Sequence, residues 1–179
     1  MDTLVFGLKN NNLIPDILPE SWQPTVNLVV SFGAKILRDG DILAPDVVKP
    51  EPTVRVEHAD TNATYTLILT DPDAPSRTDP KFGDWRHWVQ PGVRVQEDTS
   101  TVITEDPHTP YLAPSPGSGT SFHRYLIMLV QEPENFNPAP MGSKFVARRS
   151  WKAYEWIKEN GGNVVGAAWF LSRNAEDPY

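Results

Sequence analysis

Two aspartates, two histidines and a glycine loop are the residues of this chain whose types and spacing are suited to chemistry. They lie in four short segments: Asp71-Pro72-Asp73-Ala74-Pro75, Asp84-Trp85-Arg86-His87-Trp88, Pro116-Gly117-Ser118-Gly119-Thr120 and His123-Arg124-Tyr125. A charged imidazole donates two hydrogen bonds, a tyrosine adds a hydroxyl, and successive backbone N–H groups of a glycine loop can form an anion-binding concavity. Together these donors suit a phosphate or a carboxylate.

Two strands must position the acidic and the histidine segments. Residues 65–70 are predicted to form a strand that ends at Asp71, where Pro72 and Pro75 remove the donors of a ladder. Residues 125–130 are apolar on both faces, which is typical of a central strand, and His123 opens that strand. If the two strands pair antiparallel, Asp71 and His123 meet at the same sheet edge.

The alternation of side chains along a strand sorts these residues by face. His123 and Tyr125 share one face, so Tyr125 is expected to line the pocket onto which His123 opens. By the same parity Trp85, His87 and Val89 are expected to point together, so that His87 enters the pocket beside an aromatic wall.

The two aspartates are expected to have different roles. Asp71 can orient a histidine and stabilise its charged form. Asp73 is expected to be a turn residue whose side chain bonds nearby amides. Simpler interpretations stay open, because the acidic segment alone is typical of a plain rigid turn and His87 alone of a packed histidine.

Enzymatic templates fit the sequence poorly. The chain has no His-Glu-x-x-His, no Gly-Lys-Ser/Thr phosphate loop and no Gly-x-Ser-x-Gly elbow. A metal held by Asp71, His87 and His123 is chemically feasible, but we predict no metal and no other cofactor. A hydrolase that uses Ser118 or Ser121 with His123 is the remaining catalytic alternative, and we predict that the protein is not an enzyme.

The rest of the chain predicts a mainly β protein with one or two short helices. Further strands are expected at residues 26–32, 53–58, 85–89 and 164–171, the third of them ended by Pro91-Gly92. The clearest helix follows Ser150, which is expected to cap it, and it stops at Gly161-Gly162. Arg148-Arg149 is expected to be a solvated pair before this helix, and residues 106–120 a long loop.

Composition narrows the possible classes of protein. A length of 179 residues suits a single domain over residues 1–179. The net charge of −7 argues against a nucleic-acid partner, and the absence of cysteine excludes disulfides and thiolate chemistry. No stretch is apolar and long enough for an integral membrane segment, and no secretory signal is visible, so a soluble, cytoplasmic protein is expected.

The motifs together resemble the phosphatidylethanolamine-binding protein (PEBP) family. The resemblance lies in the segment from Asp71 to Arg77, in Trp85-Arg86-His87, and in a glycine loop that runs into His123-Arg124-Tyr125. Order and spacing agree, and the similarity extends over about residues 13–171. Some features of its loops resemble those of fungal members of the family.

The resemblance implies a fold, a site and partners. It implies a single-domain β-sandwich with a small anion pocket that takes a phosphate, a phospholipid headgroup or a carboxylate, and a non-catalytic regulator that binds a protein such as a kinase. A C-terminal helix that partly covers the pocket in animal members is expected to be absent, and Phe82 stands where many of them have a tyrosine. The family's ligand-binding positions correspond to Asp71, Asp73, Trp85, His87, Pro116, Gly117, Gly119, His123 and Tyr125.

A second function is also implied by the resemblance. A yeast member of the family inhibits a serine carboxypeptidase by inserting its acetylated N-terminus, and Met1-Asp2 is a terminus of the kind that is acetylated in fungi. A peptidase inhibitor that acts through its N-terminus is therefore the alternative hypothesis.

Overall fold

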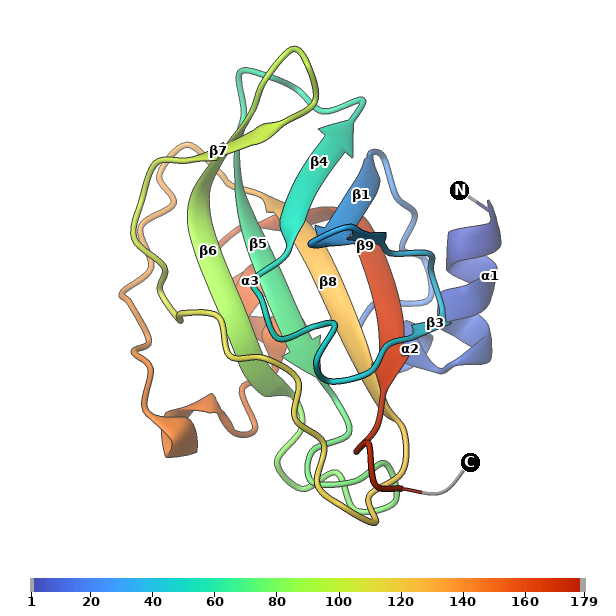
Figure 1. Ribbon diagram of the computed structural model, residues 1–179. Helices are drawn as coiled ribbons and strands as arrows, with labels where there is room; N and C mark the ends of the chain where they lie inside the picture. The colour runs from blue at the N-terminus through green and yellow to red at the C-terminus, as the bar shows by residue number, and fades with distance from the viewer. Residues whose placement is uncertain (1, 178–179) are drawn as a thin grey trace.

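Two β-sheets of unequal size form the body of the protein (Figure 1). The computed structural model describes residues 2–177. The larger sheet has six strands in the order β3-β9-β8-β5-β6-β7, and the smaller has the order β2-β1-β4. The strands are β1 (Asn27–Phe32), β2 (Lys35–Ile36), β3 (Asp41–Ile42), β4 (Thr53–Glu57), β5 (Thr64–Asp71), β6 (Trp85–Val95), β7 (Thr101–Ile103), β8 (His123–Gln131) and β9 (Asn163–Ser172).

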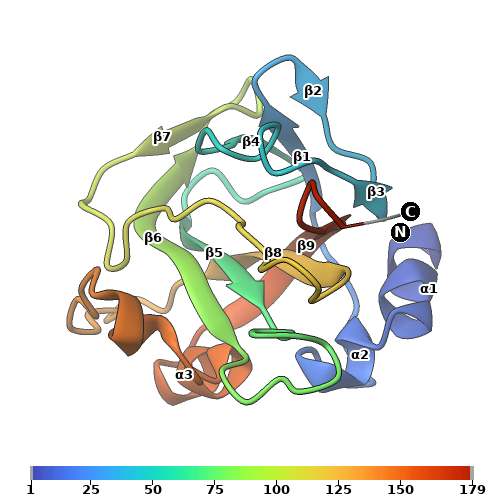
Figure 2. The same cartoon turned by 60° about the horizontal axis from the view of Figure 1, so that its bottom comes forward.

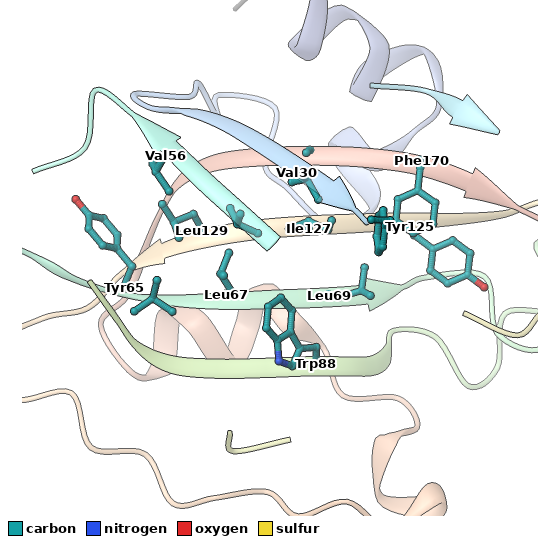
Figure 3. Packing of buried hydrophobic residues seen from close by; sticks show 14 of the residues in the cluster. Val30, Val56, Tyr65, Leu67, Leu69, Trp88, Tyr125, Ile127, Leu129 and Phe170 are labelled. Atoms are coloured by element: carbon teal, nitrogen blue, oxygen red, sulfur yellow. The ribbon is translucent and has the colours of Figure 1, made fainter. Parts of the chain in front are cut away.

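The larger sheet is buried on both faces, which explains the continuous apolar runs of β5 and β8. One face packs against the smaller sheet, so that Val30 of β1 and Val56 of β4 lie over Leu67 and Ile127 (Figure 3). The other face is covered by the helices α1 (Asp2–Asn10), α2 (Leu13–Asp16) and α3 (Ala153–Glu159), and a 3-10 helix η1 (Phe145–Arg148) lies beside β6.

The mainly β prediction is confirmed, but a simple β-sandwich describes the fold incompletely. The two sheets face each other across one core, whereas helices cover the opposite face of the larger sheet (Figure 2). There are also more helices than the one or two predicted. Residues 2–16 were not predicted to be helical, because Leu13 and Ile14 bury their side chains against the sheet through tertiary packing that a short local pattern does not reveal.

The predicted strands are present, but β6 is longer than expected. It continues through Pro91 and Gly92, since Tyr65 pairs with Val93 and Leu67 pairs with Gln90. Two residues therefore lie opposite Thr66 in a β-bulge, where a proline need not donate to the ladder.

The antiparallel pairing of β5 with β8 brings the acidic and histidine segments together. Leu69 pairs with Ile127 and Thr70 with Leu126, so Asp71 at the end of β5 reaches the start of β8. Figures 1 and 2 show the loop after β5 and the segment before β8 at the same end of the sheet. β5 has neighbours on both sides, so this site lies at the strand ends in the middle of the sheet.

The start of α3 differs from the prediction. Ser150 does not cap the helix; its hydroxyl donates to the Lys81 carbonyl, and Lys152 occupies the N-cap position without a side-chain hydrogen bond. The cap comes from a distant residue, because Asp84 Oδ2 accepts a hydrogen bond from the Ala153 N–H at 3.1 Å. The stop at Gly161 is confirmed, with a φ of 72°. Residues 173–177, after β9, form no helix.

Replacing Asp84 with Ala is expected to lower the free energy of unfolding by about 1 kcal/mol, because the first free N–H of α3 loses its acceptor. Urea unfolding followed by tryptophan fluorescence measures the change. The matched control is Asp46→Ala, since Asp46 is exposed. Equal stability of the two variants would contradict the capping role.

Candidate functional site

A cavity of about 510 Å³ opens at the end of the larger sheet where β5, β6 and β8 converge. Its volume falls within the range of roughly 300–1,000 Å³ that is common for small-molecule sites. Asp71, His87, His123 and Tyr125 form a polar floor. The other lining residues are Ala74, Pro75, Phe82, Trp85, Leu112, Ala113, Ser115, Pro116, Gly117, Thr120, Phe145 and Arg149.

His123 is held as an imidazolium by its partners. Its Nδ1 lies 2.8 Å from Asp71 Oδ2, and its Nε2 lies 3.0 Å from Thr120 Oγ1. The Thr120 hydroxyl donates its proton to the Gly117 carbonyl, so Oγ1 accepts from His123 and both ring nitrogens carry a proton. Burial opposes this charge, but the hydrogen bond and the charge of Asp71 outweigh it and raise the pKa of His123.

His87 is in the opposite protonation state. Its Nδ1 lies 2.6 Å from the Leu112 carbonyl oxygen, which can only accept, so Nδ1 carries a proton. Burial lowers the pKa of His87, and the charges of Arg148 and His123 act in the same direction. The ring is therefore neutral near pH 7, and Nε2 presents a lone pair.

Tyr125 forms the back of the floor. Its ring stacks on Phe170 at 5.0 Å (Figure 3). It also lies near-parallel to the His123 ring at 6.4 Å, while the His87 ring meets it edge-on at 5.4 Å. Burial and the charge of Asp71 raise the pKa of Tyr125 well above its ordinary value. The residue thus keeps a neutral hydroxyl.

A β-bulge changes the parity that was expected for β6. Leu69 pairs with Trp88 and Thr70 with Arg86, so His87 is an extra residue without a partner on β5. Trp88 packs on the same side as the pocket, whereas Val89 joins the core beneath the helices. The prediction that Val89 points with Trp85 and His87 is wrong, because simple alternation does not hold across a bulge.

Asp73 lies beside the cavity but not in its lining. Its carboxylate accepts from Arg124 Nη2 at 2.6 Å, from Nε and from the Arg124 backbone N–H at 2.8 Å. Asp16 of α2 binds the same guanidinium. Asp73 therefore has a structural role, but the prediction that its side chain bonds nearby amides is wrong, because its partner is Arg124 of β8.

The glycine loop contributes less to the cavity than the sequence suggested. Pro116 and Gly117 line it, but Gly119 does not. The Gly119 N–H donates to Asp177 Oδ1 at 2.7 Å, and the Thr120 N–H donates to the Gly117 carbonyl at 3.3 Å. These two N–H groups are therefore engaged within the protein.

Arg148 and Arg149 are not the solvated pair that was predicted. Arg148 is 3% exposed and donates to the carbonyl groups of Arg86, His87 and Pro110. Arg149 lines the cavity, with its guanidinium 4.2 Å from the centre of the Phe82 ring. Sequence spacing gave no signal for either role, because both depend on η1 folding back against β6.

The outer wall of the cavity is apolar and aromatic. Phe82, Trp85 and Phe145 surround the Arg149 guanidinium, and Phe145 is 61% exposed at the mouth. Arg149 Nε is buried without a hydrogen-bond acceptor. The arrangement leaves a cation beside the polar floor, with room for an apolar group next to it.

The geometry bears on the metal and hydrolase alternatives. Within residues 2–177 no group of three His, Asp or Glu side chains is placed to hold a metal ion. Ser118 and Ser121 do not line the cavity, and His123 Nε2 is bonded to Thr120.

Within residues 2–177, no helix has the length and apolar character needed to span a bilayer.

Residues 26–169 match the family model described as "Phosphatidylethanolamine-binding protein". The chain therefore belongs to this family. A phosphatidylethanolamine-binding protein from Plasmodium vivax is 26% identical, with a TM-score of 0.81 over 95% of this chain and 97% of that one.

Two further solved structures share the fold. A carboxypeptidase Y inhibitor, solved in complex with its cognate proteinase, has a TM-score of 0.84 at 21% identity, over 97% of this chain and 96% of that one. A phosphatidylethanolamine-binding protein from Plasmodium falciparum has a TM-score of 0.78 at 23% identity, over 94% and 96% of the two chains.

Replacing Asp71 with Asn is expected to lower the pKa of His123, because it removes the largest contributions that oppose the cost of burial. In the wild-type protein His123 is expected to titrate above the ordinary value of 6.5 and His87 below it. Titration of the imidazole proton resonances by NMR measures both. Two wild-type histidines that titrate at the same pH would contradict the assignment.

The raised pKa of His123 also determines how the free energy of unfolding depends on pH. Since the folded-state pKa of His123 is raised, its contribution is fully present below pH 6.5 and is lost as the pH rises through the folded-state pKa. The difference in unfolding free energy between the wild type and His123→Gln is therefore expected to shrink as the pH rises. A difference that grows with pH would reverse this conclusion.

Proposed function

We propose that the protein is a non-catalytic binding protein whose cavity takes a small anionic group, such as a phosphate, a phospholipid headgroup or a carboxylate. In this proposal it acts in the cytoplasm as a regulator by binding other proteins, a kinase being one candidate. The observation that carries the proposal is the convergence of Asp71, His87, His123 and Tyr125 from three strands on the floor of one cavity.

The local charge supports an anionic ligand despite the acidic chain. Asp71 is neutralised by the His123 imidazolium, and Asp73 by Arg124. Arg149 at the cavity and Arg148 behind it have no carboxylate partner among the ion pairs of residues 2–177. The charge that a ligand meets is therefore positive, although the whole chain carries −7.

The same groups are poorly arranged for catalysis. A general base must have a free lone pair close to a nucleophile. His123 is protonated and bonded on both nitrogens. His87 Nε2 has a lone pair, but within the described chain it has no hydrogen bond to Ser115, the one serine in the cavity lining. Binding without turnover is thus the activity that the geometry favours.

A titration with methyl phosphate is expected to shift the NMR signals of His87, His123 and Thr120 together, because these groups surround the floor of the cavity. Arg149→Gln should weaken binding by roughly tenfold, as expected for the loss of one charge-assisted hydrogen bond. The control Arg38→Gln removes an exposed arginine and should leave the affinity unchanged. Shifts confined to residues outside the cavity would remove the site assignment.

The alternative is inhibition of a serine carboxypeptidase through the N-terminus. Two observations favour it: the fold similarity to a carboxypeptidase Y inhibitor and the exposure of Phe6 in α1, which is 68% accessible. Met1 lies outside the described residues. The neighbouring Leu8 is fully buried, so α1 is held on the sheet while Phe6 faces outward.

Under this alternative, Phe6→Ala and deletion of residues 1–7 are expected to relieve inhibition of carboxypeptidase Y, measured as hydrolysis of a synthetic peptide. Phosphate binding should persist in Phe6→Ala, since Phe6 does not line the cavity. Ile36→Ala is the control, because it also removes an exposed apolar side chain. An absence of inhibition by the wild-type protein would reject the alternative.

A further inference from the structure

His87 Nε2 is the one ring nitrogen at the cavity floor that has no hydrogen bond to any residue from 2 to 177. The side chain is 5% exposed and lines the cavity, so this nitrogen faces the space where a ligand binds. The tautomer is fixed by the contact of Nδ1 with the Leu112 carbonyl, because two acceptors cannot face each other at 2.6 Å. A lone pair on Nε2 follows.

Burial and two cationic groups oppose a second proton on His87. From η1, Arg148 Nη1 donates to the His87 carbonyl at 2.9 Å, and from β8 the His123 imidazolium lies across the floor. Tyr125 contributes a neutral hydroxyl. Asp71 of β5 favours protonation, but its carboxylate is committed to His123. The segment that carries Leu112 contributes a carbonyl group, which already holds Nδ1.

The floor therefore combines positive charge with a hydrogen-bond acceptor. A fully deprotonated anion satisfies the charge but places an oxygen lone pair against the lone pair of His87. A buried acceptor that is left unpaired is costly, and sites of this kind discriminate strongly against ligands that lack the matching donor.

We propose, as a refinement that rests on the anion-binding function above, that His87 Nε2 accepts a hydrogen bond from the bound ligand and that the cavity selects the monoprotonated form of a phosphomonoester. The P–OH group donates to His87, and the remaining oxygens face the Arg149 cation. The apolar wall formed by Phe82, Trp85 and Phe145 accommodates the organic part of the ester.

Phosphomonoesters suit this arrangement because their second pKa is about 6, so the monoprotonated form is available near neutral pH. Sulfate carries two negative charges without a proton. A phosphodiester carries one negative charge without a proton. Both ligands carry negative charge but have no proton to donate to His87 Nε2. They therefore show whether binding requires only the charge of the ligand or also a hydrogen-bond donor on it.

The experiment compares methyl phosphate, sulfate, dimethyl phosphate and glycerophosphoethanolamine in NMR titrations of the full chain at pH 6 and pH 8. Methyl phosphate is expected to bind roughly tenfold or more tightly than sulfate and dimethyl phosphate at pH 6. Its affinity should fall by roughly tenfold for each pH unit above its second pKa. The other ligands control for any loss of charge on His123, because such a loss weakens all four.

Glycerophosphoethanolamine separates a lipid headgroup from a free phosphomonoester. It is a diester, but its ammonium can donate to His87 Nε2 in place of a P–OH group. The proposal expects it to bind more weakly than methyl phosphate. Equal binding would assign the donor to an ammonium and would overturn the selection of a monoester.

His87→Gln tests the residue directly. An amide can turn either a donor or an acceptor toward a ligand, so this variant is expected to bind sulfate and methyl phosphate within about threefold of each other. His58→Gln is the matched control, since His58 is exposed and outside the cavity lining. If His87→Gln still bound methyl phosphate much more tightly than sulfate, a group other than His87 would be responsible for selecting the protonated ligand, and the proposal would be overturned.

A measurement on the wild-type protein tests the protonation of His87 even if the His87→Gln variant does not fold. Long-range proton–nitrogen spectra of the free protein should show His87 with a proton on Nδ1 and none on Nε2. A protonated Nε2 at neutral pH would overturn the proposal. Equal binding of all four ligands in the cavity would overturn it while leaving anion binding intact, whereas an absence of binding by any of them would reject the proposed function itself.

Discussion

The contact between Asp71 and His123 is the interaction on which the rest of the site depends. The two residues are 52 positions apart, and the antiparallel register of β5 and β8 brings them to 2.8 Å. The pair is buried, so the carboxylate and the imidazolium each avoid the cost of an isolated charge. Burial lowers the pKa of the second histidine, His87, and outweighs the charge of Asp71, which acts in the opposite direction. The two rings therefore have different protonation states although they lie in the same cavity.

Much of this site could be predicted from the sequence because it follows from strand register. The alternation along β8 correctly separates Tyr125 from Leu126, which pack in different cores. The end of β5 at Asp71 was visible in the prolines that follow it. The prediction for the side chains of β6 was wrong, because the bulge at His87 turns Val89 to the opposite face of the sheet. No residue type in this segment indicates an extra residue in the strand.

Other features were beyond sequence analysis because they depend on long-range contacts. Asp84 caps α3 from 69 positions away, so the polar residue next to the helix was a misleading signal. Arg148 donates to carbonyl groups of Arg86, Pro110 and Ser143. A pair of adjacent arginines in the sequence does not indicate whether such buried contacts or a solvated face will result. The protonation of the histidines likewise depends on the Leu112 carbonyl and the Thr120 hydroxyl, which only the folded chain brings near.

The aspartates explain how an acidic protein can hold an anion. Asp73 is bound by Arg124, which also reaches Asp16, and Asp71 is bound by His123, so neither carboxylate presents a free charge to the cavity. The guanidinium of Arg149 rests on aromatic rings, whose faces attract a cation without neutralising it. The acidic residues therefore order the cationic groups, while the charge available to a ligand comes from an arginine that has no carboxylate partner in the described chain. An anion site of this kind needs its nearby aspartates, because the hydrogen bond and the charge of Asp71 are the largest contributions that raise the pKa of His123 against the cost of burial.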